Sequence, residues 1–166
     1  MRRLVIFFMS LALVGCSNLG NSNFSAQDLM FSEMMIPHHE QAIEMSDLAL
    51  ANSQDSDVLA LATQIKNAQA PEIDQMKSWD GSHMGSHAGH AMDGMLTDEE
   101  MHALSRAMGK EFDRLFLEGM IKHHEGAIEM AEMVIDSKNQ EVSSLANAIM
   151  TAQRAEIERM KGLLSR

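Results

Sequence analysis

Two adjacent histidines occur twice in this sequence, each time between two methionines. Residues 35–45 read MIPHHEQAIEM and residues 120–130 read MIKHHEGAIEM, so nine of eleven positions are identical. Imidazole binds copper and several other transition metals, and thioether is a soft, uncharged ligand that suits Cu(I). Because both residue types recur at the same spacing, the two segments indicate a site for soft metal ions.

Helical geometry would bring these side chains within reach of each other. At about 100° per residue, Met45 points close to the direction of His38, and Met35 stands one turn before His39. The second segment repeats this arrangement. The candidate ligands are Met35, His38, His39, Met45, Met120, His123, His124 and Met130.

The combination of imidazole and thioether selects among metals. Ca²⁺ and Mg²⁺ prefer oxygen ligands, and Zn²⁺ uses imidazole but gains little from thioether. Copper is therefore the expected ion, with Cu(I) favoured and Ag(I) as its analogue. Methionine also fills hydrophobic cores readily, and we expect this simpler role for Met76, Met133, Met150 and Met160.

A second group of candidate ligands lies in the glycine-rich residues 80–96. Tracts biased towards histidine are typical of metal binding. A solvated linker with incidental histidines is the alternative interpretation. The additional candidate ligands are His83, Met84, His87, His90, Met92 and Met95.

The motifs of an enzyme are weaker than those of a metal binder. A di-iron carboxylate enzyme needs glutamates from two helices and a Glu-x-x-His motif from each of two others. Residues 99–102 alone have that spacing, and they stand at an expected helix start. A metal binder is therefore expected. The alternatives are a helical interaction module of the cell envelope and a ferritin-like metalloenzyme.

The repeat extends beyond the histidines. Residues 68–77 match residues 152–161 at an offset of 84, one less than the offset between the histidine segments. Such self-similarity is typical of a duplicated unit, here a helical hairpin. Capping residues at Ser25 and Thr97 mark two helix starts. The expected helices are 26–52, 57–79, 98–137 and 141–164.

These elements predict an all-α fold, a four-helix bundle built from two repeated helical hairpins. Short turns make each hairpin antiparallel, and the hairpins 26–79 and 97–166 would form one domain over residues 26–166. In an up-down bundle the two helices that carry histidine pairs would run in the same direction. The sequence leaves open whether the pairs form one site or two.

The N-terminus predicts export. Residues 1–15 combine two arginines with an apolar run too short to span a bilayer, as in a signal peptide. The sequence Leu-Val-Gly-Cys is typical of lipoproteins and predicts lipidation of Cys16, followed by a polar tether over 16–25; an ordinary signal peptide is the alternative. The expected location is the periplasmic side of a bacterial envelope, and Ser17 favours the outer membrane.

The charge of the chain excludes one class of partner. It has 24 acidic and 13 basic residues, for a formal net charge of −11, and no basic stripe. Binding to nucleic acid is therefore not expected, whereas metal cations fit the acidic surface. The single cysteine rules out a disulfide framework.

The paired histidine segments and the segments Gln69–Met76 and Gln153–Met160 resemble the domain-of-unknown-function 305 family of secreted bacterial proteins. The resemblance covers nearly all residues from Phe31 to the C-terminus. It implies an exported, ferritin-like four-helix bundle, with some members that bind copper or silver and support copper resistance. By position, it assigns the family motif to the eight His and Met residues of the two histidine segments.

Overall fold

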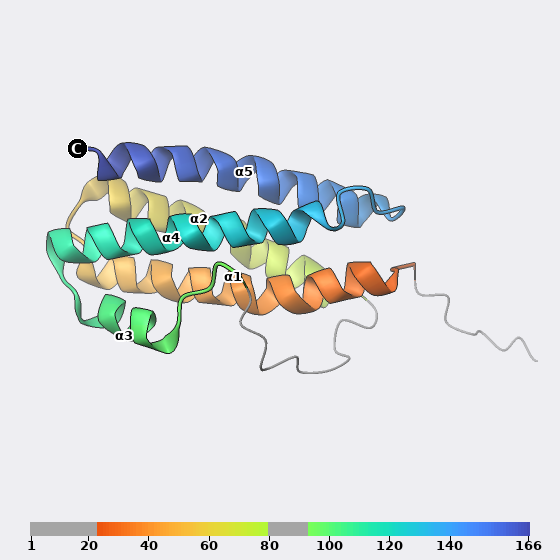
Figure 1. Ribbon diagram of the computed structural model, residues 1–166, viewed down its shortest axis with the longest axis horizontal. Helices are drawn as coiled ribbons and strands as arrows, with labels where there is room; N and C mark the ends of the chain where they lie inside the picture. Colours follow the sequence, from red (N-terminus) through yellow and green to blue (C-terminus); the bar gives the residue numbers. More distant parts are fainter. Residues whose placement is uncertain (1–22, 80–92) are drawn as a thin grey trace, which may run out of the picture.

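The computed structural model describes residues 23–79 and 93–166, and these are helical with no strand among them (Figure 1). The predicted all-α class is therefore confirmed. None of the described helices is both long and apolar enough to cross a membrane. The helices are α1 (Ala26–Asn52), α2 (Ser56–Lys77), α3 (Asp98–Arg106), α4 (Gly109–Glu132) and α5 (Gln140–Leu164).

Side-chain caps start four of the five helices. The Ser25 hydroxyl accepts from the Asp28 amide at 3.1 Å, and the Asp28 carboxylate accepts from the Ser25 amide at 2.7 Å. Thr97 makes the same reciprocal pair with Glu100 at the start of α3. Such caps satisfy amides that the helix itself leaves free, and each contributes about 1 kcal/mol.

The prediction of one helix over 98–137 is wrong. The chain leaves helical geometry after Arg106, because Ala107 and Met108 are extended, with ψ angles of 153° and 151°. The next helix starts at Gly109, whose φ of +56° is a left-handed value that glycine adopts without strain. The region therefore forms the short α3 and the long α4, which ends at Glu132.

The two hairpins, α1 with α2 and α4 with α5, pack side by side so that α1 lies along α4 in the opposite direction (Figure 1). The Gln27 amide at the start of α1 donates to the carbonyl of Met133 just after α4, at 2.6 Å. At the other end, Ser53 donates to Asp113 near the start of α4.

The expectation that α1 and α4 run in the same direction is therefore wrong. The α3 segment returns the chain to the end of the bundle at which α2 began, so that α4 runs parallel to α2 (Figure 1). A single long crossover between two hairpins is also the connectivity of ferritin-like bundles.

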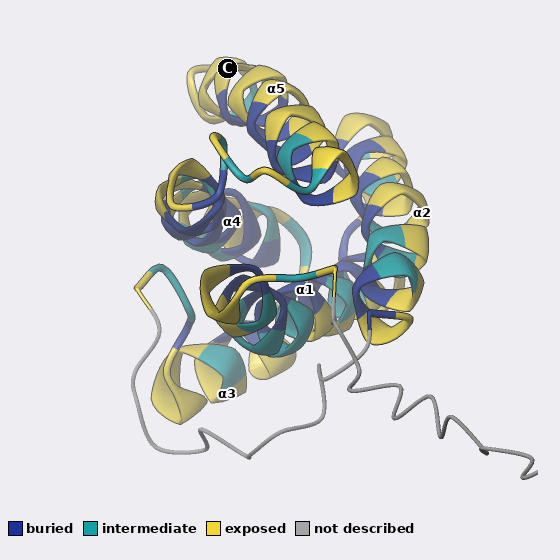
Figure 2. Cartoon of the chain, turned by 90° about the vertical axis from the view of Figure 1, so that its right-hand side faces the viewer, coloured by how far each residue is buried: buried dark blue, intermediate teal, exposed yellow. Residues whose placement is uncertain are grey.

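Two apolar clusters, one at each end of the bundle, form the core. The Phe31 cluster joins the first part of α1 to the last part of α4, and the Phe116 cluster joins the last part of α1 to the first part of α4. Phe31 and Phe116 occupy equivalent positions of the repeat, so the two clusters are related by the same symmetry as the sequence. Figure 2 shows these buried faces turned inward, with α3 outside the bundle beside α1.

Candidate metal centre

A buried polar layer lies between the two apolar clusters. In α1 it falls between Met35 of the Phe31 cluster and Ala42 of the Phe116 cluster. Burial of polar groups is unfavourable unless they find partners, so a layer of this kind needs a specific explanation. Its members are the buried residues His38, His39, Gln69, His123, His124, Gln153 and Glu156, together with the partly buried Glu72.

At the centre of this layer, His38 of α1 touches His123 of α4. Their ring centroids are 3.7 Å apart and the ring planes are inclined by 39°. The two residues are equivalent in the repeat, so a pseudo-twofold axis passes between them, as in a symmetric dimer interface. The histidine pairs of the two halves thus meet in one layer.

The two outer histidines face carboxylates on the second helix of their own hairpin. His39 Nε2 lies 2.9 Å from Glu72 Oε2 on α2, and His124 Nε2 lies 2.8 Å from Glu156 Oε2 on α5. Both contacts join equivalent positions of the repeat. The pseudo-symmetry therefore extends from the central rings to their neighbours.

The layer contains every buried side-chain nitrogen or oxygen atom that lacks a hydrogen-bond partner in the described part of the chain. Both ring nitrogens of His38 and His123 are in this group, as is Nδ1 of His39 and His124. The amide groups of Gln69 and Gln153 complete it. Each such atom costs about 1–3 kcal/mol, so a ligand that engages them would stabilise the fold.

Burial keeps the imidazoles of His38, His123 and His124 neutral. Desolvation, with smaller contributions from His39 and His124, lowers the pKa of His38 from 6.5 to about 3. Burial also holds the pKa of His123 well below its usual value, and the adjacent His38 lowers it further. The pKa of His124 falls for the same reason, although Glu156 opposes the change. These rings therefore keep free lone pairs at neutral pH, the state in which imidazole binds metals.

The four candidate methionines lie in the two clusters that flank the layer. Met35 and Met130 belong to the Phe31 cluster, whereas Met45 and Met120 belong to the Phe116 cluster. Each flank therefore contains one candidate methionine from each half of the chain. The sequence had grouped these residues within each half.

No three His, Cys, Asp or Glu side chains in residues 23–79 and 93–166 are arranged to hold a metal ion together. The closest imidazoles are the two rings at the pseudo-twofold axis. The donors that the geometry offers to an ion are therefore neutral imidazoles from both hairpins, with thioethers in the flanking clusters. This donor set fits a soft ion of low coordination number.

The segment 93–96 covers the contact between α1 and α4. The Gln41 side chain bonds both backbone groups of Leu96, accepting from its amide at 2.8 Å and donating to its carbonyl at 2.9 Å. On α4, Gly126 admits the segment, because a Cβ there would lie 2.1 Å from the Asp93 carbonyl oxygen. The backbone of Asp93 also faces His38, where it opposes the fall of the pKa.

Gln41 and Gly126 occupy equivalent positions of the repeat. This position is one of the two at which the histidine segments differ. At the other difference, Lys122 replaces Pro37 and pairs with Glu100 at 3.3 Å, at the start of α3. Three of these four residues, namely Gln41, Gly126 and Lys122, thus contact the chain that connects the hairpins. The two histidine segments therefore differ in sequence mainly at positions that contact this connection, which has no counterpart in the repeat.

Most of the second group of candidate ligands lies outside the described residues. These ligands are His83, Met84, His87, His90 and Met92. The predicted lipidation site Cys16 also lies outside the described residues. Met95 is described and is partly buried beside Leu96.

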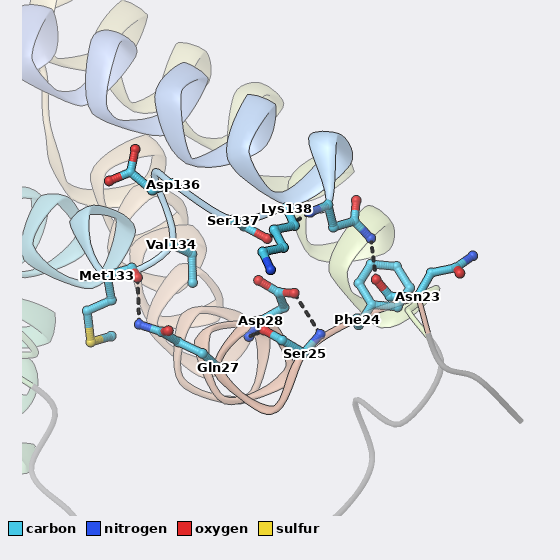
Figure 3. A pocket seen from close by; sticks show the side chains of 11 residues that line it. Asn23, Phe24, Ser25, Gln27, Asp28, Met133, Val134, Asp136, Ser137 and Lys138 are labelled. Carbon is cyan, nitrogen blue, oxygen red and sulfur yellow. Dashed lines mark hydrogen bonds between the residues drawn. The ribbon is translucent and has the colours of Figure 1, made fainter.

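A pocket of about 520 Å³ lies at the end of the bundle, between the start of α1 and the turn before α5 (Figure 3). Its polar groups bind each other, since the Asn139 amide donates to the Asn23 carbonyl and Gln27 to Met133. None of the candidate metal ligands lines it.

Four residues of the layer carried no assigned role in the sequence, namely Gln69, Glu72, Gln153 and Glu156. The available signal was the repeated Gln-x-x-Glu spacing, which places both side chains on one helix face one turn apart. The expectation of core positions holds for Met76, Met150 and Met160. It is wrong for Met133, the first residue after α4, which is exposed.

The fold and the site together define a class: helical bundles of two antiparallel hairpins with a buried histidine layer where the hairpins meet. Residues 28–164 match the family described as Domain of unknown function (DUF305). The chain belongs to this family, which confirms the resemblance seen in its motifs. The comparison with curated proteins finds no match.

Solved structures similar to this chain share its architecture. A DUF305 fragment from Deinococcus radiodurans is 32% identical, with a TM-score of 0.77 over 86% of this chain and 97% of that one. A Streptomyces coelicolor member is 31% identical, with a TM-score of 0.78 over 84% and 92%. CopM in its Cu(I)-bound form is 34% identical, with a TM-score of 0.70 over 83% and 95%.

Proposed function

We propose that this protein binds soft metal ions, copper above all and silver as its analogue, in the histidine layer between its hairpins. The observation that supports this most directly is the contact of His38 with His123. Two neutral rings from opposite hairpins meet there, and all four of their nitrogens lack hydrogen-bond partners among the described residues.

The donor chemistry supports copper over harder ions. Buried neutral imidazoles with thioethers nearby suit Cu(I), whereas Ca²⁺ and Mg²⁺ would require oxygen ligands. Relatives support the same choice. CopM, 34% identical, has been solved in Cu(I)-bound and Cu(II)-bound forms, and its silver-bound forms are 32% and 35% identical.

The proposed location is the bacterial cell envelope, with the bundle attached to a membrane through lipid on Cys16. This part rests on the sequence of residues 1–25, and the Streptomyces coelicolor relative is described as a candidate secreted protein. In that location the protein would serve copper tolerance or copper trafficking. The histidines and methionines of residues 83–95 would be additional soft ligands near the bundle.

The test is a competition for Cu(I) between a chromogenic chelator and the chain without residues 1–16, which retains every helix of the bundle. We expect the double variant His38→Ala/His123→Ala to bind Cu(I) at least about tenfold more weakly, since each imidazole is a direct ligand. His102→Ala is the matched control, because His102 is exposed on α3. An unchanged affinity in the double variant, with its helical content intact, would refute the site.

A further inference from the structure

Among the described residues, Glu72 and Glu156 are the two carboxylates that form ion-pair or hydrogen-bond contacts with histidines of the layer. We propose that they are positioning residues, which fix the proton on Nε2 of His39 and His124 and so present Nδ1 of both rings to the metal. This inference rests on the proposed function and specifies which atom of each outer histidine binds the ion.

Each outer histidine forms one hydrogen bond to a carboxylate. A carboxylate group accepts hydrogen bonds, and neutral imidazole carries its one proton on either of its two nitrogens. With Glu72 Oε2 at 2.9 Å and Glu156 Oε2 at 2.8 Å, the proton belongs on Nε2 of His39 and of His124. The lone pair is then on Nδ1 in both rings.

The ring nitrogens that lack a hydrogen-bond partner agree with this assignment. In both outer histidines Nδ1 is buried and has no hydrogen-bond partner in the described part of the chain. A carboxylate on the far nitrogen of a metal-binding histidine is a common arrangement that fixes the orientation of the ring and raises its basicity.

The central histidines differ from the outer ones. No side chain in residues 23–79 and 93–166 forms a hydrogen bond with either nitrogen of His38 or His123. Their proton positions are therefore not fixed by a side chain, and the rings can adjust to an incoming ion. Glu72 and Glu156 thus give the layer two fixed rings and two adjustable ones.

The two carboxylates are not held equally firmly. The second oxygen of Glu156 accepts from the Gln64 amide at 2.9 Å, and Gln64 in turn accepts from Arg159 at 3.1 Å. The Glu156 side chain is 6% exposed, whereas that of Glu72 is 19% exposed. We therefore expect His124 to be the more rigid ligand and Glu156 the more sensitive position.

The first experiment uses the metal-free protein labelled with nitrogen-15 histidine. Nuclear magnetic resonance distinguishes a protonated ring nitrogen from an unprotonated one, and we expect His39 and His124 to be protonated on Nε2. Glu72→Gln and Glu156→Gln replace a pure acceptor with an amide that can also donate. Each substitution should produce a mixture of tautomers at its own histidine. A proton on Nδ1 in the unsubstituted protein would overturn the proposal.

The second experiment adds Ag(I), whose nuclear spin couples to the nitrogen that binds it. Coupling should appear at Nδ1 of His39 and His124. Affinity should fall about 10- to 100-fold in Glu156→Gln and less in Glu72→Gln. Glu44→Gln makes the same charge change on the exposed face of α1 and should leave affinity unchanged. Coupling at Nε2, or unchanged affinity in both layer variants, would overturn the proposal while metal binding itself stands.

A further variant distinguishes a positioning effect from a general loss of folding. Gln64→Leu leaves Glu156 and both histidines in place and removes one partner of the carboxylate. We expect it to weaken Ag(I) binding less than Glu156→Gln does and to loosen the tautomer of His124 alone. Equal disturbance of His39 would contradict the assigned contacts. Absence of any Ag(I) binding in the unsubstituted protein would instead refute the proposed function.

Discussion

The rings of His38 and His123 can touch because neither is charged at neutral pH. Two imidazolium ions 3.7 Å apart in a dry interior would repel each other strongly. Burial lowers both pKa values and so removes that repulsion. The depressed pKa values that let the rings meet also keep their lone pairs available.

The same pKa values predict how stability depends on pH. The pKa of His38 is about 3 in the fold and 6.5 in an ordinary environment, so below pH 6.5 the unfolded chain binds a proton that the folded chain does not. The free energy of unfolding should therefore fall as the pH falls from 6.5 towards 3, by about 1.4 kcal/mol per pH unit for each such histidine.

Urea unfolding of the metal-free protein at several pH values measures this slope. His38→Leu removes one titrating ring and should reduce the slope between pH 6 and pH 4. His102→Ala, which changes an exposed histidine on α3, should preserve it. Identical slopes in all three proteins would show that His38 titrates normally in the fold.

The individual candidate ligands could be read from the sequence because helical spacing is local. The choice between one site and two could not be made from the sequence, since it depends on how α1 crosses α4. Glu72 and Glu156 received no role for the same reason. Their partners, His39 and His124, lie 33 and 32 residues away in the chain.

At the scale of the helix, the prediction was accurate where capping and periodicity act locally. Ser25 and Thr97 were correctly identified as helix starts. The break before Gly109 was missed, because the periodic apolar pattern continues through it. The direction of α4 was also missed, since it depends on the path of the connection rather than on any signal inside α4.

The close approach of segment 93–96 to α4 gives a test at the same scale. Gly126→Ala places a Cβ 2.1 Å from the Asp93 carbonyl oxygen, so the segment must move away. We expect a loss of about 1–3 kcal/mol in the free energy of unfolding, in the range for steric overpacking. Gly162→Ala is the matched control, because a Cβ there meets no atom within 4 Å.

Alanine is the better helix former, so Gly162→Ala should raise the free energy of unfolding by about 0.5–1 kcal/mol. Urea unfolding of both variants measures the two effects, which should have opposite signs. If Gly126→Ala stabilises the protein as much as Gly162→Ala, segment 93–96 is not seated against α4 in solution.

At the scale of the whole molecule, the layer joins the two hairpins. Its central rings come from α1 and α4, and the two long helices of each hairpin contribute one outer histidine and its carboxylate. A ligand that contacts both central rings would therefore bind the assembled bundle rather than either hairpin alone. Metal binding and the docking of the hairpins should be coupled.

This coupling predicts a cooperative response to metal. Free Ag(I) at about 1,000 times its dissociation constant should stabilise the fold by about 4 kcal/mol. Thermal unfolding followed by circular dichroism should show one transition that moves upward as a whole. Two transitions, of which one alone responds to Ag(I), would place the metal within a single hairpin.

The meeting of His38 with His123 on a pseudo-twofold axis has a consequence for how such a protein can be assembled. A free hairpin with one histidine segment would present half of the layer, and two identical copies could complete it as a homodimer with the same ring contact. In a single fused polypeptide, one connection must cross one face of this dimer-like unit. Gln41 and Gly126 differ because of that asymmetry. Gln41 of the first motif forms hydrogen bonds to segment 93–96, whereas Gly126 of the second motif leaves space for the backbone of that segment.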